Sequence, residues 1–334
     1  MILRFDEYNQ FNDFIKLHTV DDDNFLNERL SISEDVISET KRVVDYIQSE
    51  INNGNFNTIK PAFTYRDVEM DIVKLSNYSI KLFGKDCDLP ISITRIVSED
   101  KTNSINTSET NAEILSDLRE INSKTCVEFQ ISGNIIFLNG EITDGSVGVL
   151  GHEIRHAYEK IQIYDGKPVV TTQQIVDAWD KWLKIYRNAV SYLTANTSSQ
   201  KIKLNNETNF YNLIYTIYSS DTFELSAFTQ QTYEQCKKCK TISELTSSMK
   251  KSKLRKMIDG YDNILTIMEK PEIQYHFNQK IAEYNLDLPS LKRLTKLFKK
   301  RCKKAKSNYG KVFAFIKEEI DSKDGELIFT DVKY

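Results

Sequence analysis

Apolar side chains recur at helical spacing in the first quarter of the 334-residue chain. The stretch Ser31–Glu34 resembles a capping box, in which a serine and a glutamate tie off the first free amides of a helix. A second helix is predicted from Pro61 to Phe83, with Gly84 at its end. We therefore expect residues 1–85 to form a helical region. The stripe that supports the first helix consists of Val36, Ile37, Val43, Val44, Ile47 and Ile51.

The apolar period changes after Gly84, and short runs rich in β-branched residues predict strands. The predicted strands are Leu89–Val97, Cys126–Ile131 and Asn134–Leu138. Ser132-Gly133 is a plausible tight turn, which would join the last two strands into a hairpin. The intervening polar stretch, residues 98–113, is predicted to be an exposed loop.

Helical spacing returns at Gly145–Gln162, where the buried stripe would contain Val147, Leu150, Ile154, Tyr158 and Ile161. Asp144 precedes this stretch and is a candidate cap. Further helices are predicted at 175–192, at 210–217 and from Asp221 to about Lys238. The fold class is therefore α+β, with a small sheet, one central helix and a mainly helical C-terminal part.

Composition places the chain among soluble proteins. No apolar run approaches membrane-spanning length, and the first residues lack the continuous apolar stretch of a secretion signal. We expect a cytoplasmic protein. Five cysteines, an odd number, suit a reducing compartment better than a disulfide scaffold. Cys236 and Cys239 form a lone CxxC pair, and we expect it to bind no metal.

Charge is distributed unevenly along the chain. Residues 1–150 carry 26 acidic and 14 basic side chains, whereas residues 151–334 carry 22 and 31. The segment Leu291–Lys306 holds nine basic residues and no acid, with apolar residues at helical spacing. It predicts a basic helix within a C-terminal region, residues 241–334. Its basic face is either simply solvated or binds an acidic protein, an anionic lipid surface or nucleic acid, and scarce aromatic residues disfavour nucleic acid.

The central predicted helix contains the sequence His152-Glu153-Ile154-Arg155-His156. Residues four apart lie on one face of a helix, so both imidazoles can reach one cation. Glu153 is turned by about 100° from His152 and can hold a water molecule beside that cation. Arg155 points elsewhere, toward solvent or an acidic neighbour. The alternative is a pair of ordinary surface histidines.

This motif, the strand before it and Glu224 in a later helix resemble the gluzincins, the zincin metallopeptidases to which thermolysin belongs. The resemblance covers about Cys126 to Gln235. It implies a zincin-like domain at residues 86–240, with Asn134–Leu138 at the sheet edge, where it would pair with extended substrate. It also implies a Zn²⁺ ion held by His152, His156 and Glu224. In one departure, Phe228 stands where the thermolysin-like enzymes carry an aspartate.

The expected function is zinc-dependent hydrolysis of a peptide bond in a peptide or protein substrate, with Glu153 as general base. Glu224 alternatively ties off a helix that begins at Asp221. The other candidate third ligands are Glu207, Glu234 and His276. The alternative function is a structural component of a larger assembly, with a zincin domain of little or no activity. The Asn-, Lys- and Ile-rich composition is typical of AT-rich genomes, so a phage virion or tail protein is one such component. Candidate donors to the developing oxyanion are Tyr211, Tyr215, Tyr218 and Tyr233.

Overall fold

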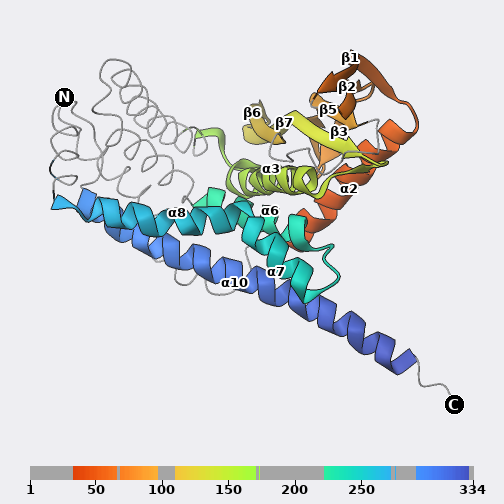
Figure 1. Ribbon diagram of the computed structural model, residues 1–334. Helices are drawn as coiled ribbons and strands as arrows, with labels where there is room; N and C mark the ends of the chain where they lie inside the picture. Colours follow the sequence, from red (N-terminus) through yellow and green to blue (C-terminus); the bar gives the residue numbers. More distant parts are fainter. Residues whose placement is uncertain are drawn as a thin grey trace, which may run out of the picture. The chain divides into compact units, whose positions relative to one another are not determined.

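The computed structural model describes residues 33–65, 68–96, 110–170, 173, 222–271, 275 and 291–330 (Figure 1). The chain divides into two compact units, each assembled from separate stretches. Unit 1 contains 1–30, 170–225 and 254–310, and unit 2 contains 31–169, 226–253 and 311–334. The described residues form six helices and one mixed sheet of eight strands. The predicted α+β class with a helical C-terminal part is confirmed.

The sheet belongs to unit 2 and is organised around the long strand β7. Strands β4 and β5 pair with β7 in parallel, and β6 and β8 pair with it antiparallel. The path of paired strands is β1-β2-β5-β7-β4-β3. The strands are β1 (Phe56–Tyr65), β2 (Val68–Leu75), β3 (Ser79–Leu82), β4 (Lys85–Asp88), β5 (Ile91–Ile96), β6 (Asn111–Ile121), β7 (Lys124–Leu138) and β8 (Glu141–Ile142).

The predicted hairpin turn at Ser132-Gly133 is wrong, because β7 runs through both residues without a break. Gly133 has a φ of 140°, and a Cβ there would lie 2.2 Å from the carbonyl oxygen of Asn111 on β6. The glycine therefore permits a close strand contact and does not make a turn. The true hairpin joins β6 to β7 through Asn122-Ser123. Both residues have positive φ, as a tight two-residue turn requires.

The helix predicted at Pro61–Phe83 is also wrong, because this stretch contains the second half of β1, all of β2 and all of β3. In β2 the β-branched residues Ile72 and Val73 pair with β5, and this strand pairing stabilises an extended chain. Pro61 lies in β1, which ends the path of paired strands, and edge strands are where a sheet tolerates proline. Among the described residues of this region, the helix is therefore confined to α2 (Glu34–Asn52) at its start.

The position of strand β6 shows that two further predictions are wrong. Asn134–Leu138, expected at the sheet edge, is flanked by β5 along its whole length, and β6 and β8 pair with its two ends on the other side. Among the described strands β6 has one strand partner, β7, so β6 is the edge strand beside α3 (Asp144–Tyr164), the helix that carries the His152–His156 motif. Residues 111–113, expected in a polar loop, begin this strand, and the rest of that loop lies outside the described residues except Thr110.

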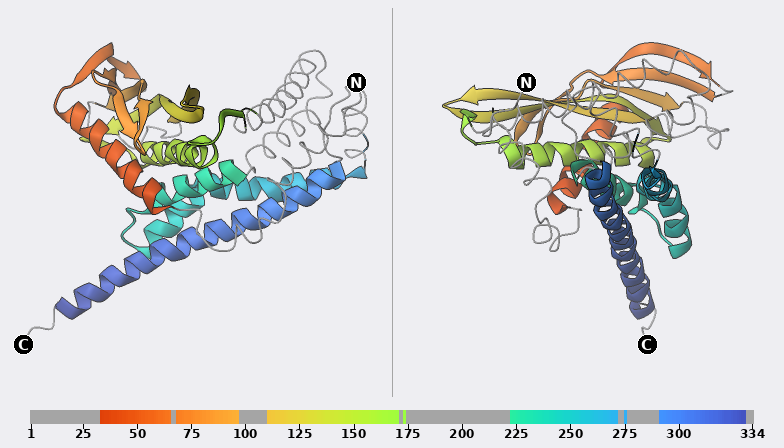
Figure 2. Two further views of the ribbon diagram at one scale, coloured as in Figure 1. Left: turned by 180° about the vertical axis from the view of Figure 1, so that it is seen from behind. Right: turned by 90° about the vertical axis from the view of Figure 1, so that its left-hand side faces the viewer.

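Two helices cover one face of the sheet in unit 2. Helix α2 (Glu34–Asn52) packs against the motif helix α3 (Asp144–Tyr164), and α3 lies along β6 and β7. Figure 2 shows the sheet as one layer with α3 along it. The predicted apolar stripe of α2 is confirmed, except that Ile37 is only half-buried. Its buried residues are Val36, Thr40, Val43, Val44, Ile47 and Ile51.

The C-terminal helices are α6 (Thr222–Cys236), α7 (Ile242–Lys251), α8 (Lys253–Met268) and α10 (Leu291–Thr330). Within unit 1, α8 and α10 run antiparallel. Arg255 lies over the ring of Tyr309 at 5.9 Å, and at the other end Lys299 forms an ion pair with Glu269. The buried α8 residues Leu254, Met257, Ile258 and Tyr261 recur at helical spacing, as do Cys302 and Ala305 on α10.

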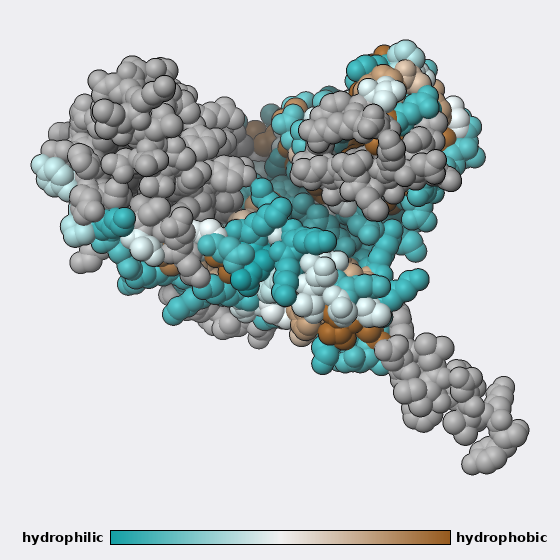
Figure 3. Space-filling model, in the orientation of Figure 1, coloured by the Kyte–Doolittle hydropathy of each residue, from teal (hydrophilic) through white to brown (hydrophobic). Residues whose placement is uncertain are grey.

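The predicted basic segment forms the first part of α10. Figure 3 shows a mainly hydrophilic surface over the coloured parts of α8 and α10. No helix among the described residues is long and apolar enough to cross a membrane. The helices predicted at 175–192 and 210–217 lie outside the described residues. Among the side chains of this segment that the structure describes, the exposed lysines are Lys296, Lys299, Lys300, Lys303 and Lys306.

Candidate metal centre

The motif helix α3 begins one residue earlier than predicted. Thr143 is its N-cap residue, with an extended backbone and no capping hydrogen bond from its side chain. Asp144 therefore lies in the first turn and is not the cap. Its carboxylate lies 3.1 Å from Lys238 Nζ, just beyond the end of α6. An acidic residue in the first turn still complements the helix dipole.

Two glycines of α3 let α6 approach closely. A Cβ on Gly148 would lie 2.5 Å from Cγ of Gln235, and a Cβ on Gly151 would lie 2.8 Å from Cγ of Glu234. At the other end of the contact, Ser226 donates a hydrogen bond to Glu159 Oε1. Along this contact the residue numbers in α6 decrease as those in α3 increase, so the two helices are antiparallel. The sequence signal was a pair of glycines three apart on one helical face.

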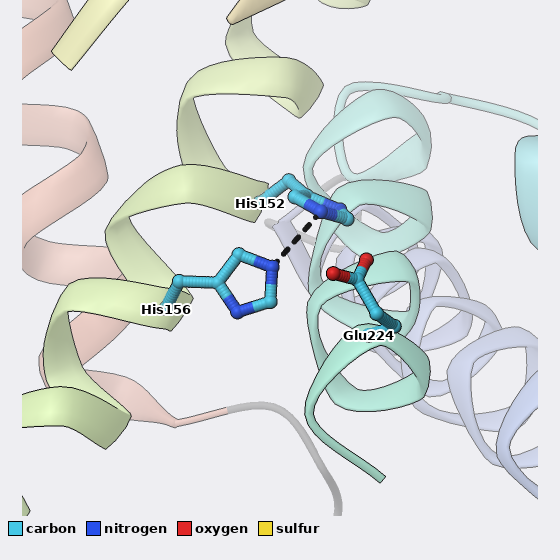
Figure 4. A group of neighbouring side chains, drawn as sticks. All are labelled: His152, His156 and Glu224. Atoms are coloured by element: carbon cyan, nitrogen blue, oxygen red, sulfur yellow. Dashed lines mark hydrogen bonds between the residues drawn. The ribbon is translucent and has the colours of Figure 1, made fainter. Parts of the chain in front are cut away.

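His152 and His156 lie together on the face of α3 that meets α6. Their Nε2 atoms are 3.2 Å apart and their ring centroids 4.8 Å apart (Figure 4). His152 is 8% exposed, and its ring packs against Phe228 of α6 with 4.6 Å between ring centroids. The aromatic residue that replaces the aspartate of the resemblance thus packs directly against the first histidine.

Glu224 lies in the first turn of α6, four residues before Phe228, so both residues share one helical face. The boundary between the two compact units falls within this helix, after Leu225. One ligand atom each of His152, His156 and Glu224 can be chosen so that all three lie within 4.8 Å of one another, which could hold a metal ion. Figure 4 shows the Glu224 carboxylate directed toward the two imidazole rings.

The donor set fits zinc in both chemistry and spacing. Structural and catalytic zinc sites take imidazole nitrogens at about 2.0–2.1 Å in a tetrahedron, which separates two such nitrogens by about 3.3–3.4 Å. The observed 3.2 Å between the two Nε2 atoms is close to this value. A hydrogen bond between opposite tautomers would give a similar distance, and then no metal would be needed.

Glu153 is buried beside these ligands. It is 7% exposed, and its Oε1 atom lies 4.0 Å from His152 Nε2. Burial there excludes bulk water from the carboxylate, while the ring nitrogen is close enough for both groups to act on one small molecule. The expected acidic neighbour of Arg155 is Glu159, which accepts a hydrogen bond from Arg155 Nε at 2.8 Å.

Glu234, one of the reserve candidates for the third ligand, makes its contacts away from the histidines. It lies ten residues after Glu224, about 15 Å along the helix, and its side chain packs at Gly151. Gln230 donates to it at 2.9 Å, and Lys237 forms an ion pair with it. Desolvation raises the pKa of this fully buried carboxyl group, and Lys237 and Gln230 counteract part of that rise.

The remaining candidates divide into described and undescribed residues. Glu207, His276, Tyr211, Tyr215 and Tyr218 lie outside the described residues, as does the proposed cap Asp221. Tyr233 is buried, its ring contacts Phe315 of α10, and burial raises its pKa.

The cysteine pair at the end of α6 contains free thiols. Burial raises the pKa of Cys236 to about 12, so its thiol stays protonated at neutral pH and is a poor metal ligand. Cys239 makes a sulfur–hydroxyl contact of 3.6 Å with Ser248. Among the described residues, the group able to hold a metal ion is the histidine–glutamate cluster and does not include this pair.

Sequence reasoning missed three residues around the histidines: Glu159, Ser226 and Phe228 in its stacking role. Glu159 could have been found as the residue one turn after His156 and four after Arg155. Ser226 and Phe228 carried no signal without the register of α6 on α3. Comparison with known proteins adds no family: no family model matches the chain, and neither curated proteins nor solved structures show a significant similarity to it.

Proposed function

We propose that the protein is a zinc-dependent peptidase in which His152, His156 and Glu224 hold the metal and Glu153 acts as general base. The observation that carries the proposal is the 3.2 Å separation of the two Nε2 atoms, with a carboxylate directed toward them from a second helix. Two imidazoles and one carboxylate leave the fourth position of a tetrahedral zinc open, as catalytic sites require.

Zinc bound there would act as a Lewis acid that acidifies water and polarises a carbonyl oxygen. The Glu153 carboxylate would take the proton from the attacking water and pass it to the leaving amine. Its 4.0 Å distance from His152 Nε2 allows this role, because the carboxylate is beside the ligand nitrogens without being one of the clustered ligands. Phe228 holds the His152 ring by packing and excludes water from one side of it.

The sheet edge supports an extended peptide as the substrate. Strand β6 lies along the motif helix, where Lys160 Nζ donates to the Ile114 carbonyl at 3.4 Å. An extended chain can add to such an edge through main-chain hydrogen bonds, which makes binding tolerant of sequence. The edge strand proposed here is β6 in place of the Asn134–Leu138 strand that the resemblance indicated.

The test separates metal binding from proton transfer. Glu153→Gln should retain one zinc per chain, because the residue is not a ligand, and should lower the rate of peptide cleavage by about 10²- to 10⁴-fold. The measurements are zinc content by elemental analysis and cleavage of a broad peptide library. The control Glu128→Gln, on the sheet, should change neither.

The double variant His152→Ala, His156→Ala should lose the zinc, and an unchanged zinc content would show that the metal centre is wrongly placed. Zinc-loaded wild-type protein that cleaves no peptide would instead favour the alternative, a structural component of a larger assembly.

A further inference from the structure

The carboxylate of Glu159 contacts both helices of the candidate metal centre. It lies on α3 one turn after His156, and its side chain is 12% exposed. Oε1 accepts hydrogen bonds from Arg155 Nε and from the Ser226 hydroxyl of α6. Oε2 lies 3.7 Å from His156 Nδ1. The two carboxylate oxygens thus have different partners, one on the neighbouring helix and one on a metal-binding ring.

The Nδ1 contact bears on which nitrogen of His156 can bind a metal. His156 Nε2 is the atom that faces His152 Nε2, so Nε2 is the ligand atom and Nδ1 must carry the ring proton. A carboxylate at Nδ1 favours that tautomer and makes the ring more basic. At 3.7 Å the contact is electrostatic, and a shift of less than about 1 Å would bring it within hydrogen-bond distance.

The Ser226 contact bears on the third ligand. Ser226 follows Glu224 by two residues in the first half of α6. Its hydroxyl anchors this part of the helix to Glu159, and hence to the turn of α3 that follows His156. The guanidinium of Arg155 neutralises the carboxylate while leaving Oε2 directed at the ring.

We infer that Glu159 is a positioning residue that holds His156 in its metal-binding tautomer and sets Glu224 against the histidines through Ser226. The inference rests on the proposed zinc centre, and it assigns a supporting carboxylate for it. Removing a carboxylate that supports a metal-binding histidine typically lowers metal affinity by about 10- to 100-fold.

The test is zinc affinity of the full chain, measured by competition with a chromogenic chelator. Glu159→Gln keeps the size of the side chain and an oxygen that can accept from Arg155 or Ser226. Its amide NH₂ would offer a donor to Nδ1, which favours the Nε2–H tautomer and competes with the metal. We expect zinc affinity to fall by about 10- to 100-fold, and the ¹⁵N signals of His156 to move toward the Nε2–H form.

Two variants separate the two contacts of the carboxylate. Ser226→Ala removes only the link to α6, so we expect a smaller loss of affinity and unchanged ¹⁵N signals. Glu159→Asp keeps the charge and should recover part of the affinity lost in Glu159→Gln. Asp165→Asn, which removes an ion pair with Lys85 just beyond the end of α3, is the matched control and should bind zinc as the wild type does.

The outcomes distinguish this inference from the proposed function. Wild-type protein that binds no zinc through its histidines would overturn the metal centre itself. Wild-type binding with unaltered affinity and ¹⁵N signals in Glu159→Gln would overturn the positioning role alone. If Glu159→Gln does not fold, unaltered zinc affinity in both Ser226→Ala and Glu159→Asp would overturn it equally.

Discussion

Two antiparallel helix pairs in this protein are packed through different proportions of apolar and polar side chains. The α8–α10 pair buries large apolar side chains, including Leu254 and the fully buried Tyr261, and keeps its charges at the rim. The α3–α6 pair meets through glycines and buries polar groups. On α6 alone the buried polar residues are Ser226, Thr229, Gln230, Gln231, Thr232 and Glu234.

This difference in buried side chains indicates the structural role of each helix pair. Apolar burial stabilises a helix pair by roughly 25 cal/mol for each Å² removed from water and tolerates small shifts. A polar interface contributes little net stability, but each hydrogen bond prescribes a geometry and leaves a costly unpaired group when it is broken. The α3–α6 contact therefore suits the precise placement of ligands, and the α8–α10 contact suits support.

The largest effect is expected in the apolar pair. Tyr261→Ala should lower the free energy of unfolding by about 3–5 kcal/mol, because it removes a large buried ring and leaves a cavity. Urea titration followed by circular dichroism measures this change. Tyr275→Ala is the control, since Tyr275 is 62% exposed, and it should cost less than about 0.5 kcal/mol. Similar losses in the two variants would contradict the assignment of a packed core to α8–α10.

The same substitution, glycine to alanine, should change the free energy of unfolding in opposite directions in the two helix pairs. Gly260→Ala in α8 should stabilise by about 0.5–1 kcal/mol, because no described atom lies within 4 Å of the new Cβ and alanine favours a helix. Gly151→Ala in α3 should destabilise by about 1–3 kcal/mol and weaken the proposed zinc binding, because its Cβ displaces Glu234. Urea titration and chelator competition check both, and stabilisation in both variants would refute the close helix contact.

The smallest effect concerns pH. Because burial raises the pKa of Glu234 in the folded state, the folded chain holds this proton at a pH where the unfolded chain has lost it. Stability should therefore fall as pH rises from the ordinary glutamate pKa through the raised one. Glu234→Gln should flatten this decline, as measured by urea titrations between pH 4 and 8. The control Glu141→Gln, at an exposed site, should keep the wild-type slope.

Local patterns predicted some elements well and others badly, for physical reasons. The helix around His152 was found because its period and its flanking breakers are local. The stretch 61–83 resembles a helix in sequence because short apolar runs fit either period, and only pairing with β5 makes Ile72 and Val73 a strand. Gly133 is compatible with a turn in the sequence alone, because glycine marks both turns and close approaches between backbones.

The sequence by itself determined that two imidazoles and a glutamate share one region of one helix, since helical geometry needs only hydrogen bonds between neighbouring residues. Only the tertiary structure decided that Glu224 faces those imidazoles, that Phe228 packs on His152 and that Glu159 reaches Ser226. These contacts join residues 67 to 76 positions apart. Their register depends on how closely α6 approaches Gly148 and Gly151, which no local pattern encodes.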